Sequence, residues 1–229
     1  MKTIATRKMG VFAIGLTVVG LAAFHSVPTL AFGHDHGDKV HQTRDVAPFH
    51  NIRVKGGIEL KLSVGKSQSV DVATEDDYQD KVKTYVEGDT LVIDMTDEDK
   101  HNIHLQDDEV TVTINMESLK GFEVLGAVDG TMDGFKGGDL SVDIRGAANL
   151  TIEGSCDKFD LDIKGAGKVD AEDMTCKDVD VAVKGVGSAS VHASDSVDAD
   201  VSGIGKITVY GHPKDVRKDT GGLGSIRIR

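Results

Sequence analysis

The sequence is poor in aromatic residues, cysteine and proline: it has no tryptophan, ten aromatic residues, two cysteines and three prolines among 229 residues. With three scattered tyrosines and no tryptophan, it nearly lacks the aromatic platforms that stack on sugar rings. Basic residues are also scarce, since 26 Lys and Arg stand against 38 Asp and Glu. The net charge of −12 argues against binding to nucleic acid or docking on an anionic membrane. Glycine is abundant, with 27 residues, and a hydrophobic content of 39% is enough for a core.

The one long hydrophobic run covers residues 11–24 (VFAIGLTVVGLAAF). It follows a basic segment and precedes Thr29 and Ala31, small residues at the −3 and −1 positions of a cleavage site after Ala31. This order predicts a secretory signal peptide over residues 1–31. A membrane anchor is the alternative, but the hydrophobic run has 14 residues, fewer than the roughly 20 that a helix needs to span a bilayer. We expect an exported protein, periplasmic, extracellular or at the cell surface, without stable membrane insertion after cleavage.

Residues 32–47 (FGHDHGDKVHQTRDVA) are polar and aperiodic, which predicts a flexible leader. His34, His36 and His41 are weak candidate metal ligands there, because neutral imidazoles bind Zn²⁺ or Cu²⁺. However, a flexible segment lacks the outer hydrogen bonds that hold a strong metal site in place. We expect no resident cofactor.

Strand-like alternation begins at Phe49 and predicts a single all-β body over residues 48–229. Its first third is less regular, with an expected helical turn at 75–81 and a charged loop at 97–109. We expect this third to cap the regular part, because an uncovered end coil invites pairing with other chains.

From residue 122 onward a glycine motif recurs every 18 to 20 residues. Its first glycines are Gly126, Gly146, Gly165, Gly185, Gly203 and Gly222. Four and two residues before each glycine, and four and six residues after it, the side chains are mostly apolar. This period of two predicts two short half-buried strands per unit, and the repeat predicts a solenoid.

Two strands, a tight glycine corner and a longer polar loop make one coil of about 19 residues. Equivalent strands of successive coils would then pair in parallel, about 4.8 Å apart. An antiparallel meander would need a hairpin between every pair of strands, which these unequal connections do not provide. We predict a right-handed parallel β-helix, regular over 122–229, whose corner glycines allow positive φ.

Cys156 and Cys176 support this register, because each lies nine residues before a corner glycine. They occupy the same position on adjacent coils, at a separation that a disulfide can span. Because an exported chain meets an oxidising compartment, we predict a structural disulfide between them. A redox-active or metal-binding pair is the alternative, but no further ligands accompany the two thiols.

Three segments of the mature chain carry a resemblance to a known family: FHNIRVKGGIELKLSVGKSQSVDVATEDDYQDKV, VEGDTLVID, and the closing SGIGKITVYG with GGLGSIRI. Together with the glycine repeat, they resemble the bacterial putative auto-transporter adhesin family, the head GIN domain, over about residues 46–229. The resemblance implies an exported β-solenoid related to the pectate-lyase-like β-helices. It implies no activity and no functional residues.

Acidic residues recur at fixed distances before the corner glycines. They are Glu123, Asp143, Asp162, Asp200 and Asp219 at −3, and Asp160, Asp180 and Asp198 at −5. Stacked carboxylates repel unless compensated, so this pattern predicts either a row of Ca²⁺ sites or a charge-paired surface. Arg145, Lys164 and Lys184, two residues further along the same face, favour the charge-paired surface.

Catalytic motifs such as G-x-S-x-G, H-E-x-x-H and a phosphate-binding glycine loop are absent from the sequence. A polysaccharide-acting β-helix enzyme is an alternative, but it would need a distinct carboxylate pair in a cleft, and no pair stands out from the ladder. We expect a non-catalytic, adhesin-like binding module that engages an envelope or surface protein or polymer, with an acidic face suited to a cationic partner. A purely structural or weakly metal-binding envelope protein stays open as an alternative.

Overall fold

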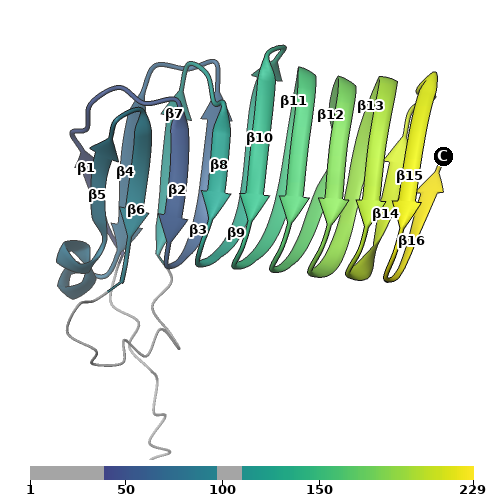
Figure 1. Cartoon of the computed structure of the whole chain (residues 1–229). Coiled ribbons are helices and arrows are strands. Elements are labelled where there is room, and N and C mark those ends of the chain that lie inside the picture. The colour runs from purple at the N-terminus through teal and green to yellow at the C-terminus, as the bar shows by residue number, and fades with distance from the viewer. Residues whose placement is uncertain (1–38, 97–109) are drawn as a thin grey trace, which may run out of the picture. The chain divides into compact units, whose positions relative to one another are not determined.

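The computed structural model describes residues 39–96 and 110–229. The predicted signal peptide, His34, His36 and the predicted loop at 97–109 lie outside the described residues. The described residues belong to one compact unit with sixteen strands and one 3-10 helix, and the strands wind into stacked coils (Figure 1). Within these ranges no helix has the length and hydrophobicity needed to cross a bilayer.

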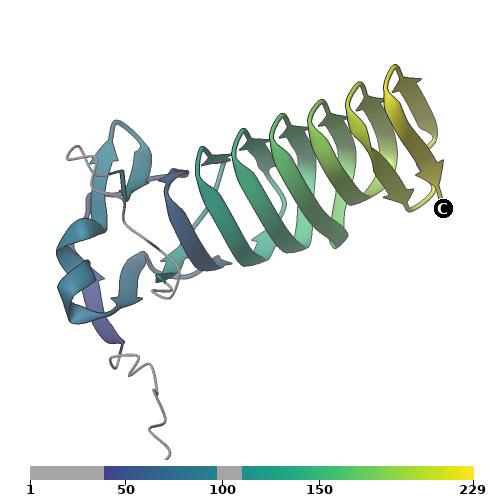
Figure 2. The same ribbon diagram turned by 90° about the horizontal axis from the view of Figure 1, so that it is seen from below.

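Each coil places one strand on each of two faces (Figure 2). In spatial order the first face contains β5 (Lys83–Glu87), β6 (Thr90–Asp94), β2 (Asn51–Lys55), β8 (Gly121–Val124), β10 (Asp139–Ile144), the second halves of β11 (Ala147–Ile163), β12 (Ala166–Val183) and β13 (Val186–Val201), and β15 (Asp215–Thr220). The second face contains β1 (Val40–Arg44), β4 (Ser69–Thr74), β7 (Thr111–Met116), β3 (Gly57–Val64), β9 (Ala127–Lys136), the first halves of β11 to β13, β14 (Ile204–Tyr210) and β16 (Leu223–Ile228). The long strands β11 to β13 therefore pass from the second face to the first.

Neighbouring coils pair in parallel, in the register that the glycine spacing predicts. Ile144 lies opposite Ile163, and Ile163 lies opposite Val183. In Figure 1 the front strands run downward, the rear strands return upward and the coils advance to the right, which is a right-handed winding. The predicted parallel β-helix is confirmed.

The core consists of columns of apolar side chains between the two faces. Ile144, Ile163, Val183 and Val201 form one such column, and all four are fully buried. Because each side chain packs on the equivalent residues above and below, one truncation disturbs three coils. Replacing a buried Val or Ile by Ala is expected to cost about 1–4 kcal/mol of stability.

The corner glycines are needed for a reason that differs from the expected one. None of the six, all within the described residues, has a positive φ. Instead, successive corners stack so closely that a Cβ on Gly146 would lie 1.9 Å from the carbonyl oxygen of Gly126. The same column begins one coil earlier, at Gly56, whose carbonyl oxygen would lie 2.0 Å from a Cβ on Gly126. Close backbone approach, rather than backbone conformation, selects glycine here.

Gly56 and Gly126 are adjacent in space because residues 65–120 form an insertion between two coils. Within it, β6 and β7 extend the two faces in parallel, and β5 and β4 then pair with them antiparallel. The 3-10 helix η1 (Asp76–Lys81) is the predicted helical turn. The less regular first third therefore covers the N-terminal end of the solenoid, as predicted.

Strand β1 lies inside residues 32–47, where the sequence predicted a flexible leader. Residues 40–44 instead pair antiparallel with β4, so the prediction is wrong for these residues. Four of the five β1 side chains are exposed, and backbone hydrogen bonds rather than side-chain burial hold the strand. The predicted metal candidate His41 lies on β1, where its Nδ1 is 2.7 Å from a carboxylate oxygen of Asp71.

The predicted disulfide between Cys156 and Cys176 is confirmed. The two residues are register partners on β11 and β12, with their Cα atoms 4.5 Å apart. A cross-link that closes a loop of this size stabilises a fold by about 3 kcal/mol in the chain-entropy model. It ties two neighbouring coils together on the side away from the glycine corners.

Candidate functional site

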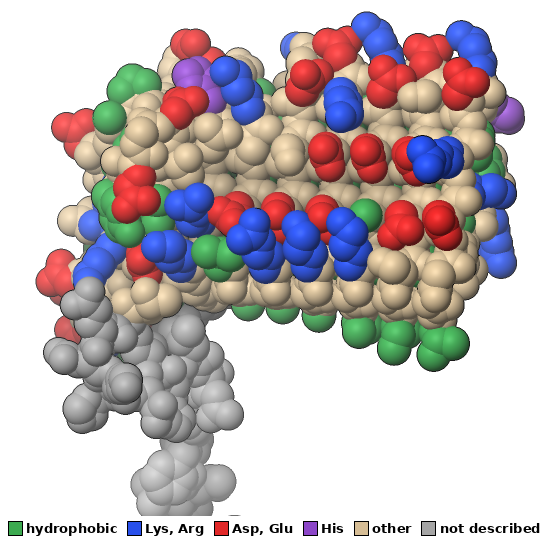
Figure 3. Space-filling model, viewed as in Figure 1, with side chains coloured by type: hydrophobic (Ala, Val, Ile, Leu, Met, Phe, Trp, Pro, Cys, Tyr) green, Lys and Arg blue, Asp and Glu red, His purple; other side chains and the backbone are tan. Residues whose placement is uncertain are grey.

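The outer surface of the first face carries charged side chains in straight columns. Because strands on this face pair in register, equivalent residues of successive coils lie about 4.8 Å apart. Figure 3 shows these columns as rows of acidic and basic side chains along the solenoid. Two columns differ in how their charge is compensated, and this difference separates a structural ladder from a candidate binding site.

The first column contains Glu123, Asp143 and Asp162 in register, here called the paired ladder. The column continues through Ala182 to Asp200 and Asp219, which make no ion pair with other described residues. The Lys164 ammonium lies 2.9 Å from a carboxylate oxygen of both Asp143 and Asp162. Arg145 contacts Glu123 and Asp143 at 3.3 and 3.1 Å. The charge-paired interpretation is therefore confirmed for Glu123, Asp143 and Asp162, and not for Asp200 and Asp219.

Ion pairing also determines how the paired ladder titrates. Burial raises the pKa of the Asp143 carboxyl, but hydrogen bonds from Arg145 and Lys164 outweigh it, so the net pKa lies below the usual value. The pKa of Asp162 is lowered in the same way, with Lys164 and Lys184 as donors. These carboxylates stay ionised at neutral pH and have little capacity for another cation.

The second column contains Ser141, Asp160, Asp180, Asp198 and Arg217 in register. Its charge is compensated only at one end, where Arg217 lies 3.6 Å from Asp198. Asp160 and Asp180 make no ion pair or hydrogen bond with other described residues. Burial, followed by the neighbouring charges of Asp160 and Asp198, raises the pKa of the Asp180 carboxyl.

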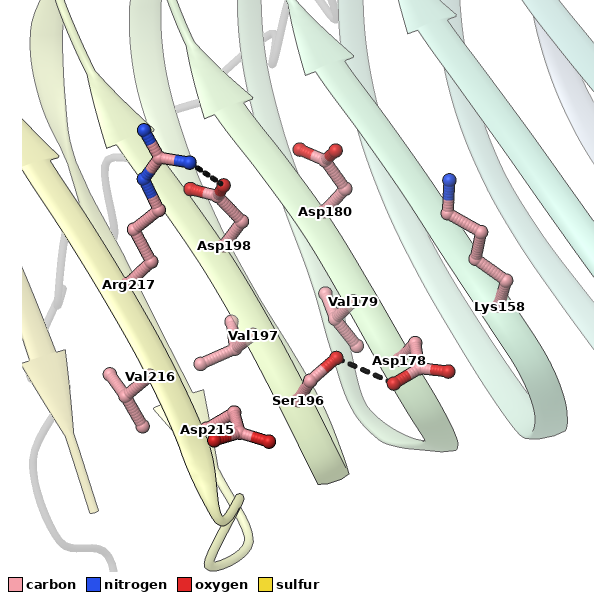
Figure 4. A pocket seen from close by; sticks show the side chains of 10 residues that line it. All are labelled: Lys158, Asp178, Val179, Asp180, Ser196, Val197, Asp198, Asp215, Val216 and Arg217. Carbon is pink, nitrogen blue, oxygen red and sulfur yellow. Dashed lines mark hydrogen bonds and ion pairs between the residues drawn. The ribbon is translucent and has the colours of Figure 1, made fainter.

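A shallow groove runs between this second column and the next one on the first face. We call it the acidic groove; its volume is about 400 Å³ (Figure 4). Its lining residues are Lys158, Asp178, Val179, Asp180, Ser196, Val197, Asp198, Asp215, Val216 and Arg217. Lys158 and Arg217 stand at its two ends, and carboxylates lie between them (Figure 4). The groove therefore presents a net negative charge, with four carboxylates and two cations in its lining, at the spacing of the coils.

Sequence reasoning identified Asp160, Asp180 and Asp198 but did not identify the other side of the acidic groove. Lys158, Asp178, Ser196 and Asp215 each lie seven residues before a corner glycine. The same spacing argument, extended by one strand position, would have found this column. No group of three or more His, Cys, Asp or Glu in the described residues is arranged to hold a metal ion.

Comparisons with known proteins agree with this architecture. A "putative adhesin" from Bacteroides fragilis has a similar structure, with 21% identity, a TM-score of 0.66, and coverage of 84% of this chain and 97% of its own. A second "putative adhesin", from Parabacteroides distasonis, has 18% identity, a TM-score of 0.51, and coverage of 84% and 98%. No curated protein is similar in sequence to this chain. The family described as "Putative auto-transporter adhesin, head GIN domain" matches residues 48–213, and the chain belongs to that family.

Proposed function

We propose that this protein is an exported, adhesin-like binding module without catalytic activity, and that its acidic groove binds a cationic segment of an envelope or surface partner. Membership of the adhesin family supports a binding role. The observation that carries the proposal is that Asp180, which lines the groove, and Asp160, its neighbour in register, make no ion pair with described residues, whereas Asp143 and Asp162 of the paired ladder do.

The contrast between the two columns argues for a ligand. In the paired ladder, each stacking repulsion is offset by a lysine or arginine two residues further along the strand. In the acidic groove the raised pKa of Asp180 reflects burial and repulsion from Asp160 and Asp198, which the more distant Lys158 and Lys184 offset only in part. A cation placed between Asp160, Asp180 and Asp198 would relieve this repulsion, so binding is favoured by charge already held in position.

The chemistry of the groove favours a basic peptide or amine-bearing polymer. Its carboxylates repeat about every 4.8 Å, so an extended chain with several ammonium or guanidinium groups can contact several coils at once. The lining has no aromatic residue on which a neutral sugar ring could stack. Val216, which is 43% exposed at one end of the groove, offers an apolar contact for the aliphatic stem of a lysine side chain.

The experiment is calorimetric titration of the exported protein with an oligolysine peptide, with an oligoglutamine peptide as the ligand control. The test variant is Asp160→Asn/Asp180→Asn/Asp198→Asn. The matched control, Glu153→Gln/Glu172→Gln/Asp173→Asn, removes the same charge from exposed carboxylates that make no ion pair with described residues. We expect at least about tenfold weaker binding for the test variant only.

Equal loss in both variants would mean that oligolysine responds to net charge alone, and would contradict a defined site. Once the groove is verified, crosslinking in intact cells followed by pull-down of the wild type and the test variant identifies the natural partner. Export is tested separately by cell fractionation. Mass spectrometry of the exported protein tests the cleavage site, because the mature chain is expected to begin at Phe32.

A further inference from the structure

A row of exposed apolar side chains follows the glycine corners along the whole solenoid. The residue after each corner glycine points outward, and these residues lie in register from coil to coil. In order they are Ala127, Ala147, Ala166, Val186, Ile204 and Leu223, here called the corner ridge. The side chains grow toward the C-terminal end, and Figure 3 shows them protruding along the lower edge.

The fold does not require this ridge. Val186, Ile204 and Leu223 are 56%, 55% and 79% exposed, so they contribute little to the core. A serine or threonine would fit the same outward positions without loss of packing. Strand propensity gives a reason for valine and isoleucine, but not for the alanines or for Leu223. A contiguous row of exposed aliphatic side chains is instead typical of a surface that meets another apolar phase.

The net charge of the whole chain does not show that charge is unevenly distributed along the sequence. Residues 204–229 contain six basic and two acidic residues, a net charge of +4, whereas residues 32–203 contain 17 basic and 36 acidic residues. Lys206 and Arg227 lie on the second face beside the large end of the ridge, and both are exposed. Asp200 and Asp219 lie on the first face, four residues before Ile204 and Leu223.

We propose that the C-terminal end of the corner ridge docks on an anionic lipid surface, with Val186, Ile204 and Leu223 entering the interface and Lys206 and Arg227 contacting headgroups. Aliphatic side chains beside basic residues are the usual composition of peripheral membrane contacts. The acidic remainder of the molecule weakens the approach only over short distances, because salt screens charge beyond about 8 Å.

The shape of the ridge favours lipid over a second copy of the chain. The ridge is one residue wide and convex, so two ridges in contact would bury far less than the roughly 800 Å² per partner of a stable interface. A bilayer interface deforms around a protruding row and needs no complementary groove. Docking by this edge leaves the acidic groove on the first face free, so this proposal does not depend on the proposed function.

The test is flotation of the exported protein with vesicles of phosphatidylcholine alone or mixed with phosphatidylglycerol. We expect binding to the mixed vesicles, and weaker binding at high salt. The variant Ile204→Ser/Leu223→Ser is expected to reduce the partition coefficient at least about tenfold. Lys206→Gln/Arg227→Gln is expected to reduce binding to the mixed vesicles only.

Matched controls keep the test specific. Val40→Ser/Leu125→Ser removes two comparably apolar residues, 41% and 39% exposed, outside the ridge. Lys83→Gln/Lys120→Gln removes two exposed lysines at the N-terminal end. Absence of flotation with mixed vesicles, or equal flotation of the ridge variant and its control, would overturn the proposal. So would light scattering that shows a wild-type dimer lost in Ile204→Ser/Leu223→Ser, because the ridge would then serve self-association.

Discussion

At the scale of single residues, close backbone stacking leaves the corner positions no tolerance for a side chain. A Cβ on Gly165 would lie 2.0 Å from the carbonyl oxygen of Gly146 and 2.5 Å from that of Arg145. Both obstructing atoms belong to residues whose backbone N–H groups donate to the Val124 carbonyl of the preceding coil, so neither can move alone. Six glycines from Gly126 to Gly222 share this constraint, which explains why glycine recurs although its conformational freedom is not used at these positions. Gly56 differs, because it has a positive φ and a Cβ there would meet the Met95 side chain.

We predict that Gly165→Ala lowers the free energy of unfolding by more than about 3 kcal/mol, or prevents folding, because two coils must separate to admit one methyl group. Gly221→Ala is the control, since a Cβ at Gly221 would have no atom within 4 Å. Urea unfolding followed by circular dichroism measures both. Equal stabilities of the two variants would contradict the stacking explanation.

Asp180 offers a second prediction at this scale. Its pKa is raised in the folded protein by burial and by Asp160 and Asp198, so its charge disfavours folding near neutral pH. For a raised pKa, the stabilising effect is present below the unfolded value and is lost as pH rises through the folded value. We therefore expect Asp180→Asn to stabilise the protein at pH 7, by less than about 1 kcal/mol because the site is solvent-screened.

The measurement is the pH dependence of the midpoint in urea. The stabilisation by Asp180→Asn is expected to shrink as pH falls through the usual range for aspartate, about 4. Asp173→Asn, an exposed aspartate outside the acidic groove, is expected to change stability little at any pH. A stabilisation that persists unchanged in acid would show that repulsion among the groove carboxylates is not its cause.

At the scale of elements, one buried amide adds side-chain hydrogen bonds to the backbone pairing that holds β1. Gln79 of η1 is 6% exposed, and its Nε2 donates to the carbonyl oxygens of Val40 and Val72 at 2.6 and 3.1 Å. Its Oε1 accepts a hydrogen bond from Arg44 at 2.9 Å. One side chain therefore connects β1, β4 and η1, which together close the N-terminal edge of the second face.

We predict that Gln79→Leu destabilises the protein by about 1–3 kcal/mol, because it leaves the Val40 carbonyl and Arg44 without this partner. Hydrogen exchange of residues 40–44 is expected to increase with it. The control is Gln42→Leu, an exposed substitution on β1 itself. If both variants exchange like the wild type, backbone pairing with β4 alone is sufficient to hold β1.

The elements also show how far sequence reasoning extends. The coils from Gly126 onward were predictable, because alternation of apolar residues and glycine spacing specify the same register independently. Gly56 was not recognised as a corner, because 70 residues separate it from Gly126 and the insertion conceals the repeat. Strand β1 was missed because exposed side chains carry no burial pattern.

The candidate surfaces were predictable only in part, and for a related reason. Periodicity placed Asp160, Asp180 and Asp198 in one column, but it does not say which column finds cations within reach. That depends on side-chain geometry across coils, such as the position of Lys164 between Asp143 and Asp162. The corner ridge was visible in the sequence as the residue after each corner glycine, yet its exposure became evident only with the fold.

At the scale of the whole molecule, the two ends of the solenoid differ in how their last strands are covered. The N-terminal end is covered by antiparallel strands, whereas β15 and β16 are the last strands of the two faces. All six residues of β15 are exposed. Lys218 and Thr220 continue the interior columns of Ala199 and Val201, so polar side chains replace the core there. Polar residues at inward positions are one way in which proteins discourage pairing at a free edge.

Because each coil contacts only its neighbours, we predict a gradient of local stability along the solenoid. Amides of residues 215–220 are expected to exchange with solvent at least about a hundredfold faster than those of 178–183, whose coil is covered on both sides. Hydrogen exchange followed by mass spectrometry measures this directly. The measurement is repeated at low protein concentration, because self-association at the C-terminal end would slow exchange only in concentrated samples. Slow exchange of residues 215–220 at both concentrations would mean that pairing with β13 is enough to hold β15, and that the polar interior of β15 costs less stability than its exposure implies.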